Sequence, residues 1–126
     1  MTDPAIRKRN RANKRKGYGW EFEVCKYFNA VGYSWQRNGQ RHGGADQGDI
    51  DTGLPLIAQC KDVERLSIWK TADDAEQQAE NADELEWVIF LKRRKATPGE
   101  GLAVVPMWLY REMLVKFHGH PDPADS

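Results

Sequence analysis

The sequence of 126 residues predicts one α/β domain in which helices cover a mixed β-sheet. Two observations lead to this prediction. Apolar or small residues recur at helical spacing in three segments. Short runs rich in β-branched and aromatic residues lie between these segments. The expected order along the chain is α-β-β-β-α-β-β-α, with no internal repeat.

The first half of the chain predicts one helix and three short strands. Apolar residues recur from Tyr18 to Val31 with the spacing of an amphipathic helix, and Gly32 is placed to end it. "YSWQRNG" indicates a strand, and the polar, glycine-rich "GQRHGGADQGD" indicates a loop. "DID" and "PLIAQCK" flank "TGL", which contains the glycine of a tight turn, so we expect a β-hairpin there.

The second half predicts two helices and two strands. Alanines at 72, 75, 79 and 82 form a small-residue stripe that would let a helix over 69–82 lie close against a sheet. "EWVIFL" and "LAVVP" are expected strands around the basic turn "KRRKATPGEG", and "MWLYREMLVKF" is an expected final helix. Four tryptophans lie on apolar stripes and are expected in the core: Trp20, Trp69, Trp87 and Trp108.

Charge is strongly segregated although the net charge is zero. Residues 1–16 carry a charge of +6, and the remaining 110 residues carry −6. We expect residues 1–16 to be a flexible basic arm that contacts a polyanion, residues 17–117 to be the folded domain, and residues 118–126 to be a disordered tail. A solvated tail without a partner is the alternative reading of the arm. The arm contains seven basic residues: Arg7, Lys8, Arg9, Arg11, Lys14, Arg15 and Lys16.

Composition argues against several classes of protein. The two cysteines, Cys25 and Cys60, lie in apolar segments, so the sequence suggests neither a disulfide framework nor a zinc finger. No apolar run approaches the length needed to cross a bilayer, and no apolar segment follows the basic N-terminus. These features predict a soluble cytoplasmic protein without a membrane partner.

The predicted hairpin carries an unusual group of polar residues. Because side chains alternate along a strand, Gln59 and Lys61 share one face while Cys60 points to the other. A two-residue turn would send Asp49 to the face opposite Gln59. A three-residue loop would pair Asp49 with Ile57 and gather the acid, the amide and the lysine on one face. We therefore predict an odd-length loop or a compensating bulge.

These residue types suit a hard divalent cation. The carboxylate of Asp49 and the amide oxygen of Gln59 are ligands of the kind that Mg²⁺ or Mn²⁺ takes. Such an ion can activate a bound water and neutralise charge on a phosphodiester. Lys61 could orient that water or stabilise the phosphate. Glu21 shares a stripe with Cys25 and Phe28 on the first helix, so its carboxylate is expected to lean inward toward this site.

The chain resembles the PD-(D/E)xK nuclease superfamily in the order of three motifs, "KGYGWE", "GDID" and "QCK". It resembles in particular the small Holliday-junction resolvases of phages and archaea. Its "QCK" is similar to the QxK motif of Mrr-type restriction enzymes. The resemblance implies a restriction-endonuclease-like α-β-β-β-α-β core. It matches Glu21, Asp49, Gln59 and Lys61 to catalytic positions. It also implies a metal site formed by Glu21, Asp49, Gln59 and the backbone carbonyl of Cys60. A homodimer acting on DNA, in the cytoplasm of a cell or of a phage host, is implied as well.

The chain departs from the family at Gln59, where a carboxylate is usual, and this departure keeps an inactive nuclease among the alternatives. Arg41 and His42 in the glycine-rich loop are candidate phosphate contacts or surface residues without a role. Lys92–Lys95 are either a DNA-backbone contact or a solvated turn. A zinc site formed by His118, His120 and the two cysteines is a weaker candidate.

The sequence thus predicts a metal-dependent endonuclease that hydrolyses phosphodiester bonds, with branched DNA such as a Holliday junction as the favoured substrate. Alternatives are a repair or restriction-type nuclease acting on duplex or flapped DNA, and an inactive nucleic-acid-binding protein. For the active enzyme, replacing Asp49 or Lys61 by alanine is expected to abolish cleavage while leaving the fold intact.

Overall fold

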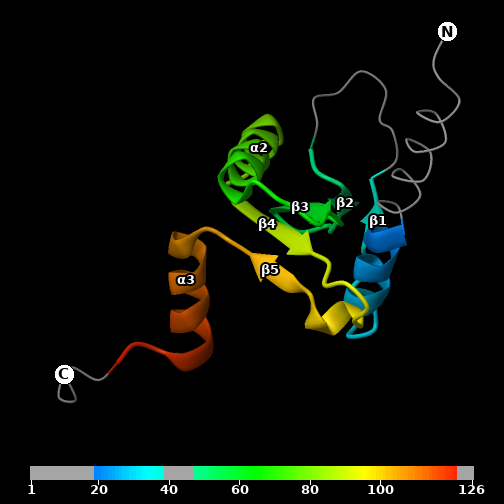
Figure 1. Ribbon diagram of the computed structural model, residues 1–126. Coiled ribbons are helices and arrows are strands. Elements are labelled where there is room, and N and C mark those ends of the chain that lie inside the picture. The colour runs from blue at the N-terminus through cyan, green and yellow to red at the C-terminus, as the bar shows by residue number, and fades with distance from the viewer. Residues whose placement is uncertain (1–18, 39–46, 122–126) are drawn as a thin grey trace, which may run out of the picture.

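A five-stranded mixed sheet forms the centre of the molecule in the computed structural model, which describes residues 19–38 and 47–121 (Figure 1). The strands lie in the order of the chain: β1 (Gln36–Arg37), β2 (Ile50–Asp51), β3 (Leu56–Lys61), β4 (Glu86–Leu91) and β5 (Leu102–Val104). The helical elements of the described part are a first helix over residues 19–29, α2 (Ile68–Asn81), the short 3₁₀ turn η1 (Pro98–Glu100) and α3 (Met107–His118). The predicted α/β class and element order are confirmed.

The sheet combines two kinds of strand pairing. β1, β2 and β3 form an antiparallel meander, and β5 pairs antiparallel with β4. β3 and β4 are parallel, with partners running from Leu56–Glu86 to Lys61–Leu91. A parallel pair needs a crossover connection, and α2 supplies it. Because of this crossover, the carboxyl ends of β3 and β4 lie next to each other at one edge of the sheet.

The first helix and α2 cover opposite faces of the sheet (Figure 1). Alternation along β3 divides the core, since Ala58 packs with the first helix and Ile57 packs under α2. On the α2 face the predicted alanine stripe is confirmed, because Ala75 and Ala79 are buried against the sheet. Small side chains there allow the close approach of helix and sheet. The first-helix cluster contains Trp20, Val24, Cys25, Trp35, Ile50, Ala58, Val88 and Phe90.

Two of the four tryptophans expected in the core are exposed instead. Trp20 and Trp87 are buried, but Trp69 is 81% exposed and Trp108 is 41% exposed. The buried face of α2 is set by Thr71, Ala75, Gln78 and Ala79, and Trp69 lies on the other side of that helix. Trp35 is buried, where its ring stacks on Phe28 at a centroid distance of 4.3 Å.

Several sequence predictions fall on residues that the structure does not describe. These are the basic arm of residues 1–16, the loop residues Arg41 and His42, and residues 122–126 of the tail. In the described part, α3 continues to His118, one residue beyond the predicted domain boundary. No helix among the described residues is long and apolar enough to span a membrane.

Candidate functional site

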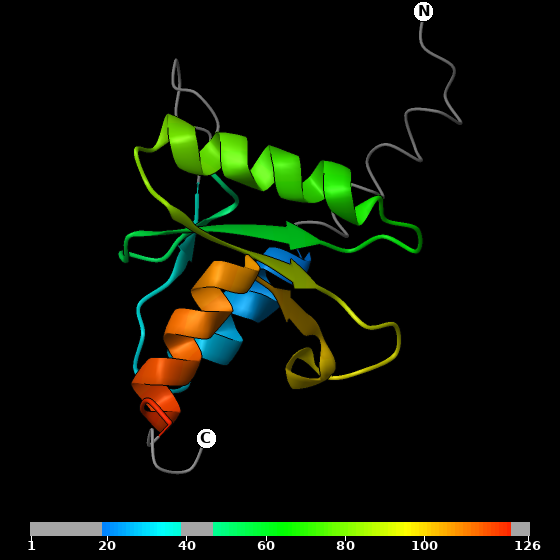
Figure 2. The same cartoon turned by 90° about the vertical axis from the view of Figure 1, so that its left-hand side faces the viewer.

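The predicted site residues lie around the carboxyl end of β3. Figure 2 shows that β3 and β4 end on the same side of the molecule where α2 and the first helix begin. The amide of Lys92 donates to the carbonyl of Lys61 at 3.1 Å and holds the two strand ends together. In open α/β sheets, ligands bind outside the carboxyl ends of parallel strands. This edge is therefore the place in the fold where a site is expected.

The pairing of β2 with β3 differs from both predicted hairpin registers. Ile50, rather than Asp49 or Asp51, is opposite Ala58. The amide of Asp49 also donates to the carbonyl of Ala58, at 2.8 Å. Two successive residues of one strand thus face a single residue of the other, which is the arrangement of a β-bulge. The predicted pairing of Asp49 with Ile57 is wrong, whereas a bulge, predicted as the alternative to an odd-length loop, is present and sets the position of Asp49.

Gly48 makes this close approach possible. It has a φ of +96°, and a Cβ atom there would lie 2.8 Å from the carbonyl oxygen of Ala58 and 2.9 Å from Cγ2 of Ile57. Both values are shorter than real Cβ contacts, and glycine adopts positive φ without a steric penalty. The glycine of "GDID" therefore lets the backbone ahead of Asp49 lie directly against β3.

The carboxylate of Asp49 binds the backbone of β3. Its Oδ2 accepts a hydrogen bond of 2.8 Å from the amide of Cys60. The carboxylate thus accepts the hydrogen bond that a backbone carbonyl would accept if β2 began earlier in the chain. A strand residue directs its N–H and C=O to the same neighbour, so the Cys60 carbonyl also faces the edge where Asp49 lies. Asp49 and the Cys60 carbonyl, two of the predicted ligands, share this edge.

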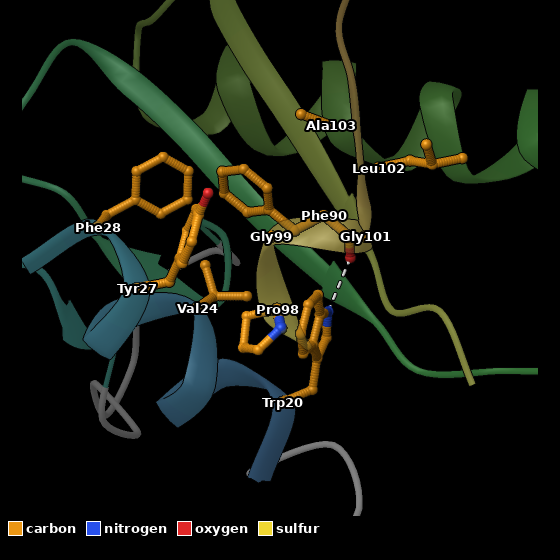
Figure 3. A pocket seen from close by; sticks show the side chains of 10 residues that line it. All are labelled: Trp20, Val24, Tyr27, Phe28, Phe90, Pro98, Gly99, Gly101, Leu102 and Ala103. Atoms are coloured by element: carbon orange, nitrogen blue, oxygen red, sulfur yellow. Dashed lines mark hydrogen bonds between the residues drawn. The ribbon is translucent and has the colours of Figure 1, made fainter. Parts of the chain in front are cut away.

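Glu21 reaches the same region from the first helix. Trp20 anchors that helix, because its indole Nε1 donates to the Phe90 carbonyl at 3.0 Å beside an apolar cavity of about 140 Å³ (Figure 3). The Glu21 side chain is 14% exposed, so it leans inward as expected. Its Oε2 accepts a 2.8 Å hydrogen bond from Nε of Arg37 on β1. Glu21 is therefore held in an ion pair that the sequence analysis did not foresee.

The Cys60 thiol lies in a buried region that carries negative charge from Asp49 and Glu21. Burial is the main cause that raises its pKa far above the ordinary value, and the negative charges of Asp49 and Glu21 raise it further. The pKa of the Cys25 thiol is also raised, by burial and then by Glu21. Asp49 and Glu21 thus both lie near enough to the Cys60 thiol to act on its pKa. Both cysteines are free thiols, and each stays protonated at neutral pH.

Gln59 and Lys61 lie on the other face of β3. They alternate with Cys60 and share the face of Ile57, which packs under α2. Gln59 is 5% exposed, and its Oε1 accepts no hydrogen bond in the described part of the chain. A buried polar atom without a partner costs about 1–3 kcal/mol. Gln59 therefore has an oxygen that is available for a ligand.

Lys61 ends β3 and is partly exposed. Among the described residues, no ion pair engages its ammonium group. Asp49 binds the Cys60 amide on the side of β3 that faces β2. The predicted site residues thus meet β3 in two ways: Asp49 binds the Cys60 amide, and Gln59 and Lys61 project on the face that α2 covers.

The basic turn after β4 is largely used within the protein. Lys92 lies 3.5 Å from Glu23, and Arg93 donates to the Glu100 carbonyl at 2.9 Å. Arg94 lies 3.7 Å from Asp62, whose side chain is only 2% exposed. The sequence analysis missed Asp62 as a member of this region. Its alternation with Cys60, just after Lys61, was the signal that could have found it.

The acidic residues do not gather tightly enough to form a metal site by themselves. Within residues 19–38 and 47–121, no three side chains of the His, Cys, Asp and Glu types could hold one ion. The end of β3 and its partner Asp49 instead carry a mixed set of oxygens: one carboxylate, one amide and one peptide carbonyl. Comparison with protein-family models, curated proteins and solved structures gave no match.

Proposed function

We propose that this protein is a Mg²⁺- or Mn²⁺-dependent DNA endonuclease of the PD-(D/E)xK type. The observation that carries the proposal is the conjunction at the carboxyl end of β3. There the Asp49 carboxylate binds the Cys60 amide, the buried Gln59 has an amide oxygen without a donor, and Lys61 carries an ammonium group without an ion pair in the described chain.

The oxygens at this edge fit a hard divalent cation. Asp49, Gln59 and the Cys60 carbonyl would hold it, because oxygen donors with retained waters are what Mg²⁺ and Mn²⁺ prefer. The orphaned oxygen of Gln59 supports this fit, since a cation would satisfy it. Glu21 would act through the water shell while its ion pair with Arg37 is kept. The bound ion would supply an activated water and charge neutralisation on the phosphodiester.

The residues of the chain have separate tasks in this proposal. Asp49 supplies the negative charge, and its bond to the Cys60 amide fixes that charge at the strand edge. Lys61 supplies a compact positive charge at the end of the same strand, suited to the extra negative charge on a phosphate under attack. Arg37 holds Glu21 in position. On the basis of the sequence, we also propose that Arg41 and His42 contact phosphates of the DNA.

Branched DNA is the substrate that we favour. The basic arm of residues 1–16 would bind phosphates without sequence preference. Trp69 presents an exposed ring in the first turn of α2. The start of α2 lies on the side of the molecule where β3 ends (Figure 2). Exposed aromatic rings stack on base faces that are not covered by a neighbouring base, and flaps and the open centre of a junction offer such faces. The cytoplasm of a cell, or of a host cell for a phage protein, is the proposed location.

One observation favours a second function, that of an inactive nucleic-acid-binding protein. The Glu21 carboxylate already pairs with Arg37, and Gln59 replaces a carboxylate, so the described site holds a single unambiguous anionic ligand in Asp49. An ancestral catalytic site retained for structure would look the same. This reading keeps the basic arm as the DNA-binding element and predicts binding without cleavage.

A cleavage assay tests the proposal directly. A four-way junction, a flap, a single strand and a matched linear duplex are each incubated with Mg²⁺, Mn²⁺ or chelator. We expect metal-dependent cutting of the junction in preference to the duplex, and its loss in Lys61→Ala. Lys26→Ala, at an exposed lysine on the first helix, is the matched control and is expected to cut normally.

The other outcomes of this assay separate the alternatives. Equal cutting of junction and duplex would identify a repair or restriction-type nuclease. Binding without any metal-dependent cutting would leave the inactive binder. Full activity of Lys61→Ala would remove Lys61 from the proposed chemistry.

A further inference from the structure

α3 is an amphipathic helix whose apolar side faces solvent. Met107, Tyr110, Met113, Leu114 and Phe117 follow the spacing of one helical stripe, and their side chains are 40–86% exposed. Leu109 is the buried side chain of this helix. In Figure 1, α3 (orange) lies well apart from the first helix (blue), beyond the β5 edge of the sheet. An amphipathic helix normally buries such a stripe.

The stripe forms a surface of the size that protein interfaces use. At about 150–250 Å² for each large side chain, these exposed fractions leave roughly 600 Å² of apolar surface in water. That area is at the upper end of the largest patches on monomers, about 300–600 Å², and approaches the roughly 800 Å² that each partner contributes to a standard interface. The surface is also hollowed, by an open groove of about 440 Å³. The groove is lined by Tyr110, Met113, Leu114, Lys116, Phe117 and His118.

We propose that α3 is the self-association surface of the protein and that its occupant is the α3 of a second copy, packed antiparallel across a two-fold axis. The stripe is self-complementary in the way that an isologous interface requires. Aliphatic Met113 and Leu114 form its centre, and aromatic Tyr110 and Phe117 lie three residues to either side. An antiparallel pair centred between Met113 and Leu114 therefore sets Tyr110 opposite the partner's Phe117.

The neighbouring edge of the sheet supports the same occupant. β5 is the edge strand next to α3, and its residues Leu102 and Ala103 are exposed. β5 contains no charged residue and no proline, the usual guards of an exposed edge. A second copy covering α3 would shield this edge as well. The proposal does not depend on the nuclease chemistry, although a two-fold dimer would carry two copies of the candidate site.

The test measures the mass of the full chain in solution, without DNA or metal. We expect sedimentation equilibrium at micromolar concentrations to give twice the mass of one chain. Met113→Glu and Phe117→Glu would bury a charge at the interface core, so each should raise the dimer dissociation constant by about tenfold or more. Leu85→Glu is the matched control, because Leu85 is about as exposed as Phe117 but lies before β4. It should remain dimeric.

A second variant makes the test independent of any effect on folding. Met113→Cys should form a disulfide between copies under mild oxidation, because Met113 lies beside the proposed axis. Leu85→Cys and the wild type should not. A monomeric wild type overturns the proposal and points to a different partner for α3. A dimer that survives both charged α3 variants and gives no Met113→Cys cross-link also overturns it, because the interface then lies elsewhere.

Discussion

Asp49 has a structural task in addition to its proposed chemical one, and this changes how it should be tested. Asp49→Ala would leave the amide of Cys60 without its acceptor, at a cost of about 1–3 kcal/mol. The expectation that alanine leaves the fold intact is therefore replaced by an expected loss of stability. Asp49→Asn keeps a side-chain oxygen that can accept the same hydrogen bond while removing the charge. We expect it to retain most of the stability and to lose metal-dependent cleavage.

Urea denaturation and the junction-cleavage assay together measure this difference between the two Asp49 variants. The proposed role of the charge is contradicted by an Asp49→Asn variant with wild-type cleavage. The structural role is contradicted if Asp49→Ala unfolds at the same urea concentration as the wild type.

The raised pKa of Cys60 predicts a loss of stability at alkaline pH. In the unfolded chain the thiol ionises near its ordinary pKa of about 8.5, whereas burial, Asp49 and Glu21 keep it protonated in the folded state. Above that pH the unfolded state binds fewer protons than the folded state, so the free energy of unfolding falls as pH rises. Below that pH both states hold the proton, and Cys60 adds no pH dependence.

Denaturation of the wild type and of Cys60→Ala across this pH range isolates the effect. The difference between their unfolding free energies should shrink as pH rises above about 8.5. Cys25 is present in both proteins, so its own raised pKa cancels in the comparison. Parallel curves would show that the Cys60 thiol ionises in the folded protein as easily as in the unfolded chain.

At the scale of elements, the start of β2 depends on Gly48. Gly48→Ala would place a Cβ atom against the Ala58 carbonyl and would also strain a backbone with φ of +96°, a conformation that costs about 1–3 kcal/mol for other residues. β2 would have to move away from β3, which loosens the bond from Asp49 to Cys60. We expect reduced stability together with reduced cleavage.

Gly53→Ala is the matched control for this prediction. Gly53 also has a positive φ, of +68°, but a Cβ atom there would meet nothing within 4 Å. It should lower stability through strain alone and leave cleavage unchanged. Thermal unfolding and hydrogen exchange of the Cys60 amide measure both effects. If exchange of that amide is equally slow in the two variants, Gly48 does not control the position of Asp49.

The elements of this fold could be predicted from sequence, whereas the contacts between them could not. "EWVIFL" coincides with β4, and the alanine stripe identified both α2 and its buried face. A bulge at Asp49 was predicted only as an alternative to an odd-length loop, because the periodicity of the sequence does not show which residue of β2 faces the Ala58 carbonyl. Trp69 was assigned to the core because its type is apolar, although the position of the alanines already set it on the outer side of α2.

The candidate site was predictable to a similar extent. The order of Glu21, Asp49, Gln59 and Lys61 along the chain indicated one region, and the structure brings Asp49 and Glu21 close to Cys60. Strand alternation predicted that Gln59 and Lys61 share the face opposite Cys60, whereas the bond of Asp49 to the Cys60 amide could not be predicted, because it follows from the bulge. The ion pair of Glu21 with Arg37 joins residues 16 positions apart and depends on how the first helix crosses β1.

At the scale of the whole molecule, the separation of a basic arm from an acidic body is expected to determine the affinity for DNA and its salt dependence. The body of 110 residues carries a charge of −6, so without the arm it would be repelled by a polyanion. The seven basic residues of the arm provide attraction to DNA that outweighs this repulsion. Each contact that they make with a phosphate releases counterions, so binding depends on the salt concentration. Replacing all seven by glutamine keeps the length of the chain and removes only the charge. We expect weaker binding to a four-way junction and a smaller salt dependence.

Fluorescence anisotropy over a range of salt concentrations measures this dependence as the slope of log K against log salt. With a slope of about −0.9 for each phosphate contact, the loss of seven contacts would make it less steep by up to about 6. Lys70→Gln on the acidic body is the single-charge control and should change it by no more than about 1. If the glutamine variant keeps the wild-type slope, the arm does not bind phosphates, and the positive charge that holds DNA must come from the folded domain. Cleavage should survive in the glutamine variant when the protein is in large excess over the DNA, because Asp49, Gln59 and Lys61 are unchanged and only the binding step is weakened.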